Sequence, residues 1–178
     1  MSKKILLISA SPRQQGNSDI LCDEFIRGAK ESGHNAEKIR LADQNINYCT
    51  GCCSCISGNG TCAQQDDMNE IYGKILSADV LVLASPVYFR SFNGQMKTFI
   101  DRVCPIYSMI SNKDIYFIIS AAGGKLPVES TVQSFRVFTG CLHGNQEKEV
   151  IASTGIWDEG GVKGSKASKQ AYEAGLKA

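Results

Sequence analysis

Short apolar runs recur along the chain, and each is followed by a segment of different character. Three of the runs are unbroken, at Ile5–Ile8, Val80–Ala84 and Ile115–Ile119. A short continuous run of this kind is typical of a strand buried on both faces of a sheet. Ala36–Leu41 and Glu149–Ser153 are less apolar but predict two further strands.

The segments that follow these runs carry apolar residues at helical spacing. After Ser18, Ile20, Leu21, Phe25, Ile26 and Ala29 would lie on one helix face. Four more helices are predicted: one capped by Asp66 or Asp67, one over Asn93–Cys104, a weaker one over Val128–Leu142 and one from about Lys166. This alternation of strand and helix predicts a parallel sheet covered by helices on both faces.

Length and charge limit the classes of protein to consider. A chain of 178 residues suits one domain spanning 1–178, and neither a repeat nor a linker divides it. A net charge of +1, with no basic block, argues against nucleic acid or a membrane surface as the main partner. The first apolar run ends at Ser9, too early for a signal peptide, so we expect a cytoplasmic protein.

Three polar or glycine-rich segments follow predicted strands: Ser9–Ser18, Ser85–Asn93 and Ser120–Gly124. Sites in parallel sheets lie beyond the carboxyl ends of the strands, so these segments could bind a phosphate, a flat ring and the polar edge of that ring. The first holds Arg13 and opens a helix, and a helix start favours anions. It lacks the P-loop and dinucleotide patterns, and an ordinary capped turn is the alternative.

Two motifs in this order resemble the flavodoxin-like NAD(P)H-dependent FMN reductases. They are Ser-Pro-Arg-x-x-Gly-Asn-Ser at 11–18, and Ser-Pro-Val-Tyr-Phe at 85–89 followed by Asn-Gly-Gln-Met-Lys-Thr-Phe-Ile-Asp-Arg at 93–102. The resemblance implies a flavodoxin-like three-layer α/β fold, a five-stranded parallel sheet of order 2-1-3-4-5, and bound FMN.

The resemblance also implies which residues contact the FMN. The phosphate would be held by Ser11, Arg13, Gly16, Asn17 and Ser18. Pro86, Val87, Tyr88 and Phe89 would line the ring, and Ser120, Ala121, Ala122 and Gly123 would meet its pyrimidine edge. For the two aromatic residues the alternative is ordinary core or rim packing.

The implied function is that of an FMN-dependent oxidoreductase. It would take a hydride from NAD(P)H and reduce a quinone, a flavin or a similar acceptor, with the chemistry carried by FMN and no catalytic side chain. A non-enzymatic flavin and iron–sulfur electron carrier or redox sensor, acting between protein partners, is the alternative, and a cofactor-free protein of the same fold is a third. Because shallow flavin sites are commonly completed by a second subunit, we expect a homodimer or homotetramer. Trp157 is interpreted as a packing or subunit-contact residue.

Eight cysteines are unusual for a cytoplasmic protein, in which structural disulfides are rare. The spacing Cys49-x2-Cys52-x2-Cys55-x6-Cys62, within Ala42–Gln65, fits a compact iron–sulfur pattern. It resembles the iron–sulfur flavoproteins, a branch of the same family with a [4Fe-4S] cluster near the FMN, where the cluster would relay single electrons.

Three other interpretations of the cysteine loop stay open. The four thiolates could bind zinc, the loop could hold a redox-active dithiol formed by Cys52 with Cys53 or Cys55, or it could hold no metal. We favour the cluster, with Cys52 chosen over Cys53 by spacing alone. Cys22, Cys104 and Cys141 are expected to be free and buried.

Overall fold

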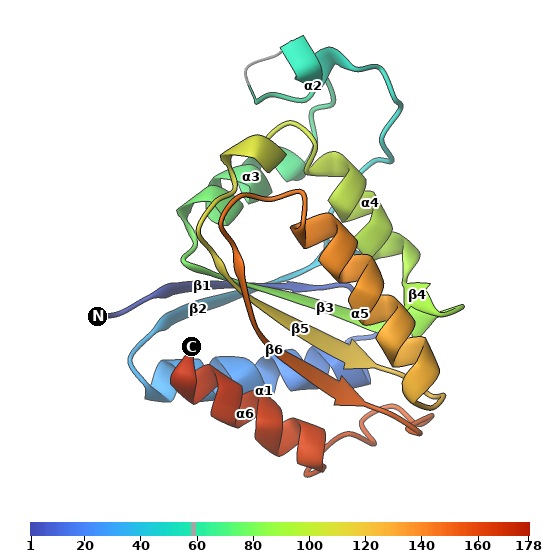
Figure 1. Ribbon diagram of the computed structural model, residues 1–178. Coiled ribbons are helices and arrows are strands. Elements are labelled where there is room, and N and C mark those ends of the chain that lie inside the picture. The colour runs from blue at the N-terminus through green and yellow to red at the C-terminus, as the bar shows by residue number, and fades with distance from the viewer. Residues whose placement is uncertain (58–59) are drawn as a thin grey trace.

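Five parallel strands form a sheet between two layers of helices in the computed structural model, which describes residues 1–57 and 60–178 (Figure 1). The strands are β1 (Lys4–Ser9), β2 (Asn35–Arg40), β3 (Val80–Tyr88), β5 (Asp114–Ser120) and β6 (Gln146–Ser153). Their order is β2-β1-β3-β5-β6, which is the expected 2-1-3-4-5 order when the parallel strands are numbered along the chain. The predicted flavodoxin-like fold is therefore confirmed. A two-residue strand that was not predicted, β4 (Ser91–Phe92), pairs antiparallel with the end of β3.

The two helical layers contain different numbers of helices, which come from different parts of the chain. One face of the sheet is covered by α1 (Asn17–Glu31) and α6 (Lys166–Lys177), and the other by α3 (Met68–Ser77), α4 (Gly94–Arg102) and α5 (Lys125–Thr139) (Figure 1). Shorter helical segments are η1 (Leu41–Asp43), α2 (Ser54–Ser57) and η2 (Tyr107–Met109). None of the helices in the described ranges is both long and apolar enough to span a membrane.

Each face of the sheet packs its own hydrophobic core. Leu6 and Ile8 of β1 belong to the core under α3, α4 and α5, whereas Ile5 and Leu7 belong to the core under α1 and α6. Side chains of a strand alternate between the two faces, so a strand buried on both faces must be apolar at every position. This requirement explains the unbroken apolar runs in the sequence.

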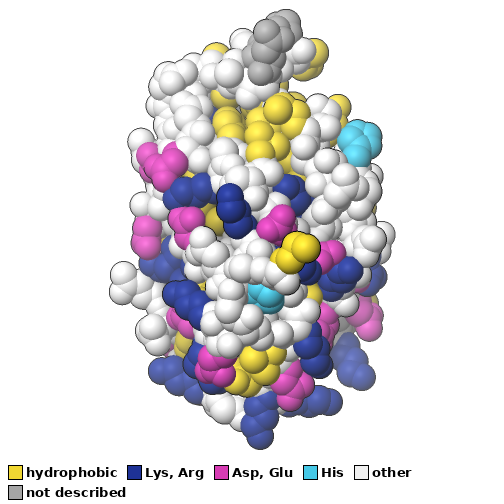
Figure 2. Space-filling model, turned by 90° about the vertical axis from the view of Figure 1, so that its left-hand side faces the viewer, with side chains coloured by type: hydrophobic (Ala, Val, Ile, Leu, Met, Phe, Trp, Pro, Cys, Tyr) yellow, Lys and Arg dark blue, Asp and Glu magenta, His cyan; other side chains and the backbone are white. Residues whose placement is uncertain are grey.

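The strand register brings the carboxyl ends of the central strands to one edge of the sheet. Ser9 of β1 pairs with Ala84 of β3, and Ser120 of β5 pairs with Pro86 and with Ser153. The segments that follow these strands therefore meet in space. The cysteine loop projects elsewhere, beyond α3 and α4 (Figure 1). Figure 2 shows charged side chains of both signs mixed over one face, with hydrophobic side chains gathered toward the end that carries this loop.

Candidate functional site

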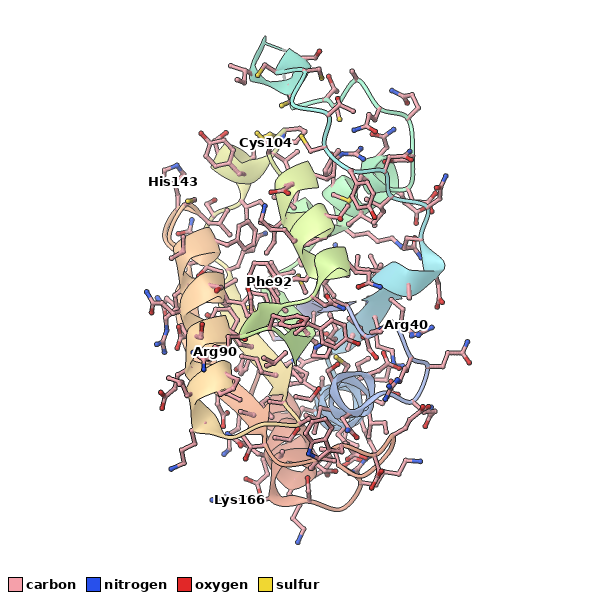
Figure 3. All side chains as sticks on the ribbon, turned by 90° about the vertical axis from the view of Figure 1, so that its right-hand side faces the viewer. Arg40, Arg90, Phe92, Cys104, His143 and Lys166 are labelled. Carbon is pink, nitrogen blue, oxygen red and sulfur yellow. The ribbon has the colours of Figure 1, made fainter. Side chains whose placement is uncertain are left out.

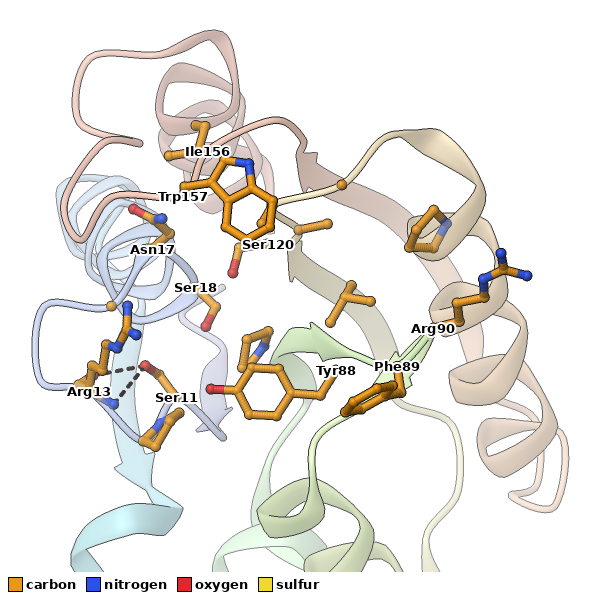
Figure 4. Close-up of a pocket in the computed structure, with 18 residues that line it drawn as sticks. Ser11, Arg13, Asn17, Ser18, Tyr88, Phe89, Arg90, Ser120, Ile156 and Trp157 are labelled. Carbon is orange, nitrogen blue, oxygen red and sulfur yellow. Dashed lines mark hydrogen bonds between the residues drawn. The ribbon is translucent and has the colours of Figure 1, made fainter.

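A cavity of about 590 Å³ opens where the segments after β1, β3, β5 and β6 meet (Figure 4). Every residue predicted to contact a cofactor lines it: Ser11, Arg13, Gly16, Asn17, Ser18, Pro86, Val87, Tyr88, Phe89, Ser120, Ala121, Ala122 and Gly123. The structure thus brings three segments of the chain together around one space, while the cofactor contacts themselves stay predictions. Pro12, Arg90, Pro127, Ile156 and Trp157 complete the lining and were not predicted to do so.

The first loop has the form of an anion site at the start of a helix. Gly16 is the N-cap of α1 and has no side chain to bond the N–H groups of the first turn, which are left for a ligand. A Cβ on Gly16 would lie 2.3 Å from Oγ of Ser11, so only glycine fits there. Oγ of Ser11 donates to the carbonyl of Arg13 at 2.8 Å and accepts from its N–H at 3.2 Å, which fixes the turn.

Two polar side chains of this loop fit a phosphate. The Ser18 side chain is 1% exposed, and its Oγ has no hydrogen-bond partner within the described ranges. A buried hydroxyl without a partner is costly, and a phosphate oxygen would satisfy it. The Arg13 side chain is exposed, and no carboxylate of the described residues pairs with it. FMN, through its phosphate, is therefore compatible with the residues present.

The side chain of Asn17 bonds the segment between β6 and α6. Its Nδ2 donates to the carbonyl of Asp158 at 3.0 Å, and its Oδ1 accepts from the N–H of Val162 at 3.2 Å. The side chain is thus engaged by the segment between β6 and α6, and the contact of Asn17 with the phosphate stays a prediction. The Asn17 backbone N–H, in the first turn of α1, still faces the anion site.

The second loop is a tight hairpin that displays aromatic side chains. Phe89 and Arg90 have positive φ values of 46° and 65°, and they connect β3 to β4. Tyr88 is 47% exposed and Phe89 is fully exposed, so core packing of these two residues is excluded, while the alternative of rim packing stays open. They lie at the mouth of the cavity instead (Figure 4).

Asn93 ties the first two loops together behind the cavity. Its Nδ2 donates to the carbonyl of Ala10 at 2.5 Å, and its backbone N–H donates to Oγ of Ser85 at 3.1 Å. Its Oδ1 accepts from the N–H of Met96, which caps α4. Asn93 therefore fixes the end of β1 and the start of α4 relative to β3, through its side chain and its backbone N–H.

The third loop is joined to the segment after β6. The N–H of Ala121 donates to the carbonyl of Ser153 at 2.9 Å, and the N–H of Gly155 donates to the carbonyl of Gly123 at 3.1 Å. Trp157 follows, lines the cavity and is 78% exposed, so the expected packing within the chain is wrong, while the alternative of a subunit contact stays a prediction. Its position beyond the end of a fifth parallel strand is the signal that could have placed it in the site.

The predicted metal ligands are not gathered into a site. Cys49 and Cys52 are exposed, and Cys55 and Cys62 are half-buried. Within residues 1–57 and 60–178, no group of three or more His, Cys, Asp or Glu side chains is placed to hold a metal ion. The arrangement of thiols therefore does not fit a four-thiolate cluster, and ligation by these cysteines stays a prediction. Hydrogen bonds from Ser54 lower the pKa of Cys52 to about 7.

The remaining cysteines divide differently from the expectation. Cys22 is buried as predicted, and burial raises the pKa of its thiol. Cys104 and Cys141 are exposed, so the prediction of burial is wrong for both. Sγ of Cys104 lies 3.7 Å from Sγ of Cys55, and Figure 3 shows Cys104 at the foot of the cysteine loop.

Comparison with known proteins places these features in context. Residues 3–173 match the family described as NADPH-dependent FMN reductase. Over 102 residues the chain is 42% identical to an iron-sulfur flavoprotein of Archaeoglobus fulgidus. The aligned region covers 57% of this chain and 46% of the relative. The chain spans about half the length of the curated relatives that it matches most strongly.

Solved structures share the fold at low identity. An NAD(P)H:quinone oxidoreductase from Methanothermobacter marburgensis aligns with a TM-score of 0.76 at 19% identity, over 99% of this chain and 97% of the other. An FMN-dependent NADH-azoreductase from Bacillus anthracis, solved in complex with FMN, aligns with a TM-score of 0.73 at 18% identity, over 98% of each chain. At these identities the likeness establishes the fold.

Proposed function

This chain belongs to the NADPH-dependent FMN reductase family, and we propose that it is an FMN-dependent oxidoreductase. It would take a hydride from NAD(P)H and pass electrons to a quinone, a flavin or a similar acceptor. The observation that carries the proposal is the first loop, where the start of α1, Ser18 and Arg13 line one space, and where the Ser18 hydroxyl has no partner among the described residues. FMN carries a phosphate group, and the start of a helix is a site that binds phosphate.

The other loops give the remaining roles of the chain in this proposal. Tyr88 and Phe89 would flank the flat ring of FMN, and the segment Ser120–Gly123 would meet its pyrimidine edge. Since the N–H of Ala121 is bonded to Ser153, the backbone N–H groups of Ala122 and Gly123 would stabilise negative charge there. Bound FMN would supply the hydride-accepting ring. The ionisable side chains among the cavity-lining residues are Arg13, Tyr88 and Arg90. The described lining holds no carboxylate, histidine or thiol, and we assign the chemistry to the cofactor.

The test is reduction of the FMN-loaded chain under anaerobic conditions by NADPH and by NADH, followed by the loss of flavin absorbance. Rapid bleaching by either nucleotide supports the reductase. Bleaching only by a reduced electron-transfer protein would overturn it in favour of an electron carrier. Arg13→Ala should weaken FMN binding about tenfold and leave riboflavin binding unchanged, because riboflavin lacks the phosphate that the guanidinium would bind.

A [4Fe-4S] cluster that relays single electrons is a separate prediction within this proposal. It is supported by the spacing of Cys49, Cys52, Cys55 and Cys62, and by the names of relatives such as the one from Archaeoglobus fulgidus. Because the described thiols do not form the site, we assign no electron path to it. Anaerobic purification with iron, sulfide and FMN assays decides the matter: about four irons per FMN would support the cluster. FMN without iron would leave a cluster-free reductase.

A further inference from the structure

We propose that Asp19 is a positioning residue of the anion site at the start of α1, where the phosphate of FMN would bind. Its carboxylate lies behind the first loop, and among the described residues it is not part of the cavity lining. It fixes the first turn of α1 against β1 and β2. The inference rests on the proposed function, because FMN is the ligand whose phosphate this site would hold.

Asp19 is a buried carboxylate with three polar contacts, all made by the same oxygen. The residue is 3% exposed, and its Oδ1 accepts a hydrogen bond from Oγ of the fully buried Ser9 at 2.7 Å. The same Oδ1 lies 3.2 Å from Nζ of Lys38 and 3.5 Å from Nε of Arg40. A buried charge is costly unless it has partners of this kind. These contacts therefore hold the Asp19 side chain in one place.

The three partners of Asp19 come from two neighbouring strands. Ser9 is the last residue of β1 and pairs in register with Arg40, the last residue of β2. Lys38 lies two residues before Arg40, so both side chains point to the same face of the sheet. Figure 3 shows Arg40 beside the start of α1, the helix that covers this face. Asp19, in the first turn of α1, thus joins the helix to both strands at the point where the first loop leaves β1.

The direction of the Asp19 side chain leaves the start of the helix available to a ligand. An acidic residue in the first turn of a helix is attracted to the unpaired N–H groups there and can bond them itself. Within residues 1–57 and 60–178, the Asp19 carboxylate instead bonds Ser9 and contacts the two cations of β2, and it bonds no N–H group of α1. Asp19 therefore fixes the anion site without occupying it.

Lys38 and Arg40 offset the negative charge of Asp19. A carboxylate in the first turn of α1 would otherwise repel a phosphate bound at the same helix start. Each cation also has a second carboxylate, Asp23 for Lys38 and Asp43 for Arg40. Neither cation would lose its last charge partner if Asp19 were made neutral. The effect of position and the effect of charge can therefore be separated by substitution.

The experiment measures equilibrium binding of FMN and of riboflavin to the FMN-free chain by flavin fluorescence, and needs no turnover. Riboflavin lacks the phosphate, so the dissociation constant of riboflavin divided by that of FMN reports the phosphate contribution alone. Asp19→Ala should lower this ratio about tenfold, and Ser9→Ala, which removes only the donor, about fivefold. A general loss of stability would weaken both flavins alike and leave the ratio unchanged. If Asp19→Ala does not fold, Ser9→Ala decides.

Asp19→Asn is the conservative variant that separates position from charge. The amide oxygen of asparagine can accept the hydrogen bond from Ser9, so the ratio should stay within about twofold of the wild-type value. Asp23→Ala is the matched control, because Asp23 lies one turn later on α1, is exposed and also pairs with Lys38. Its ratio should equal that of the wild type.

Three results would overturn the positioning role. A higher ratio in both Asp19→Ala and Asp19→Asn would show that charge repulsion, rather than position, governs phosphate binding. A ratio in Asp19→Asn as low as in Asp19→Ala would show that the bond from Ser9 does not set the position. Unchanged ratios in Asp19→Ala and Ser9→Ala would separate the carboxylate from the anion site altogether.

Failure of the proposed function would look different from these results. It would show as absence of flavin reduction by NADPH and by NADH in the wild type, while both dissociation constants remain measurable. Equal affinity of the wild-type chain for FMN and riboflavin would remove the anion site itself, and the positioning role of Asp19 with it.

Discussion

The carboxylate of Asp66 forms a two-pronged ion pair with the guanidinium of Arg102, at 2.6 and 2.9 Å, and both side chains are buried. Arg102 also donates to the carbonyl of Asn47 at 2.7 Å, and Asp66 accepts from the N–H of Asn47 at 3.0 Å. Residues at the two ends of the cysteine loop are thus held by one arginine at the end of α4. Since Asn93 caps the same helix at the cavity, α4 joins the loop to the site.

Asp66→Asn should destabilise the chain in a pH-dependent way. Burial alone would raise the pKa of Asp66, but hydrogen bonds from Arg102, Asn47 and Met68 hold it below its usual value of 3.8. The ion pair therefore stabilises the fold above that value, and the stabilisation is lost as pH falls through the lowered pKa. We expect the substitution to cost about 3 kcal/mol at neutral pH, because it leaves a buried arginine without its charge partner.

Urea unfolding at several pH values measures this cost. The difference between wild type and Asp66→Asn should shrink as pH falls below about 4, because the carboxylate then binds a proton in the unfolded chain before it does so in the folded chain. Asp101→Asn is the control, because Asp101 precedes Arg102 on α4 and forms a solvent-exposed ion pair with Lys97. Its cost should stay below about 1 kcal/mol. If Asp66→Asn and Asp101→Asn lowered the free energy of unfolding equally, burial of the Asp66–Arg102 pair would not be the cause of its contribution to stability.

Ser18→Ala should separate stability from cofactor binding. In the FMN-free chain the substitution removes a buried hydroxyl that has no partner in the described structure, so the melting temperature should stay equal or rise. FMN binding should weaken about tenfold, because a phosphate would accept a hydrogen bond from that hydroxyl. Thermal unfolding and FMN titration check the two effects. The control is Ser134→Ala, at a half-buried serine of α5 whose hydroxyl bonds the carbonyl of Ser130. A clear loss of stability in the FMN-free chain would show that Oγ of Ser18 is satisfied within the protein.

Two physical reasons allowed the sheet and the cavity to be predicted from the sequence. Strands buried on both faces need apolar residues throughout, and loops after parallel strands gather at one edge. The strand β4 could not be predicted, because it depends on positive φ values at Phe89 and Arg90, which non-glycine residues rarely adopt. The strand order came from the family resemblance rather than from periodicity.

The side chains that were misjudged depend on contacts between distant segments. Helix α4 ends at Arg102, two residues before the predicted end at Cys104, so the Cys104 side chain turns to solvent rather than into the core. The hydrogen bonds of the Asn17 amide to a segment more than one hundred residues away were likewise not predicted. Spacing along the chain carries no information about such partners.

Oxidation of the metal-free chain should join Cys55 to Cys104. Their sulfur atoms are 3.7 Å apart, and both side chains reach solvent. Oxidised glutathione can react by exchange: one thiolate displaces glutathione to form a mixed disulfide, and the second thiolate displaces the other glutathione. Peptide mapping without reductant should find the linked pair in wild type and in Cys141→Ser, but not in Cys104→Ser. A disulfide within the loop instead would contradict this arrangement. A Cys55–Cys104 bond would make Cys55 unavailable as a metal ligand for as long as the chain stays oxidised.

Two glycine-to-alanine substitutions should change stability in opposite directions. A Cβ on Gly175 of α6 would lie 2.0 Å from the carbonyl oxygen of Phe25 on α1, whereas one on Gly73 of α3 would meet nothing within 4 Å. Gly175→Ala must push the two helices apart and should cost about 3 kcal/mol. Gly73→Ala should stabilise by about 0.5–1 kcal/mol, because alanine loses less conformational freedom in a helix.

Chemical denaturation of both variants gives these free energies, and FMN titration adds a second measurement. Because α1 begins at the anion site, a displacement of that helix by Gly175→Ala should also weaken FMN binding, and Gly73→Ala should leave it unchanged. A stabilising effect of Gly175→Ala would mean that α1 and α6 are not in backbone contact in solution. Normal FMN binding despite the loss of stability would instead show that α6, rather than α1, moves to admit the methyl group.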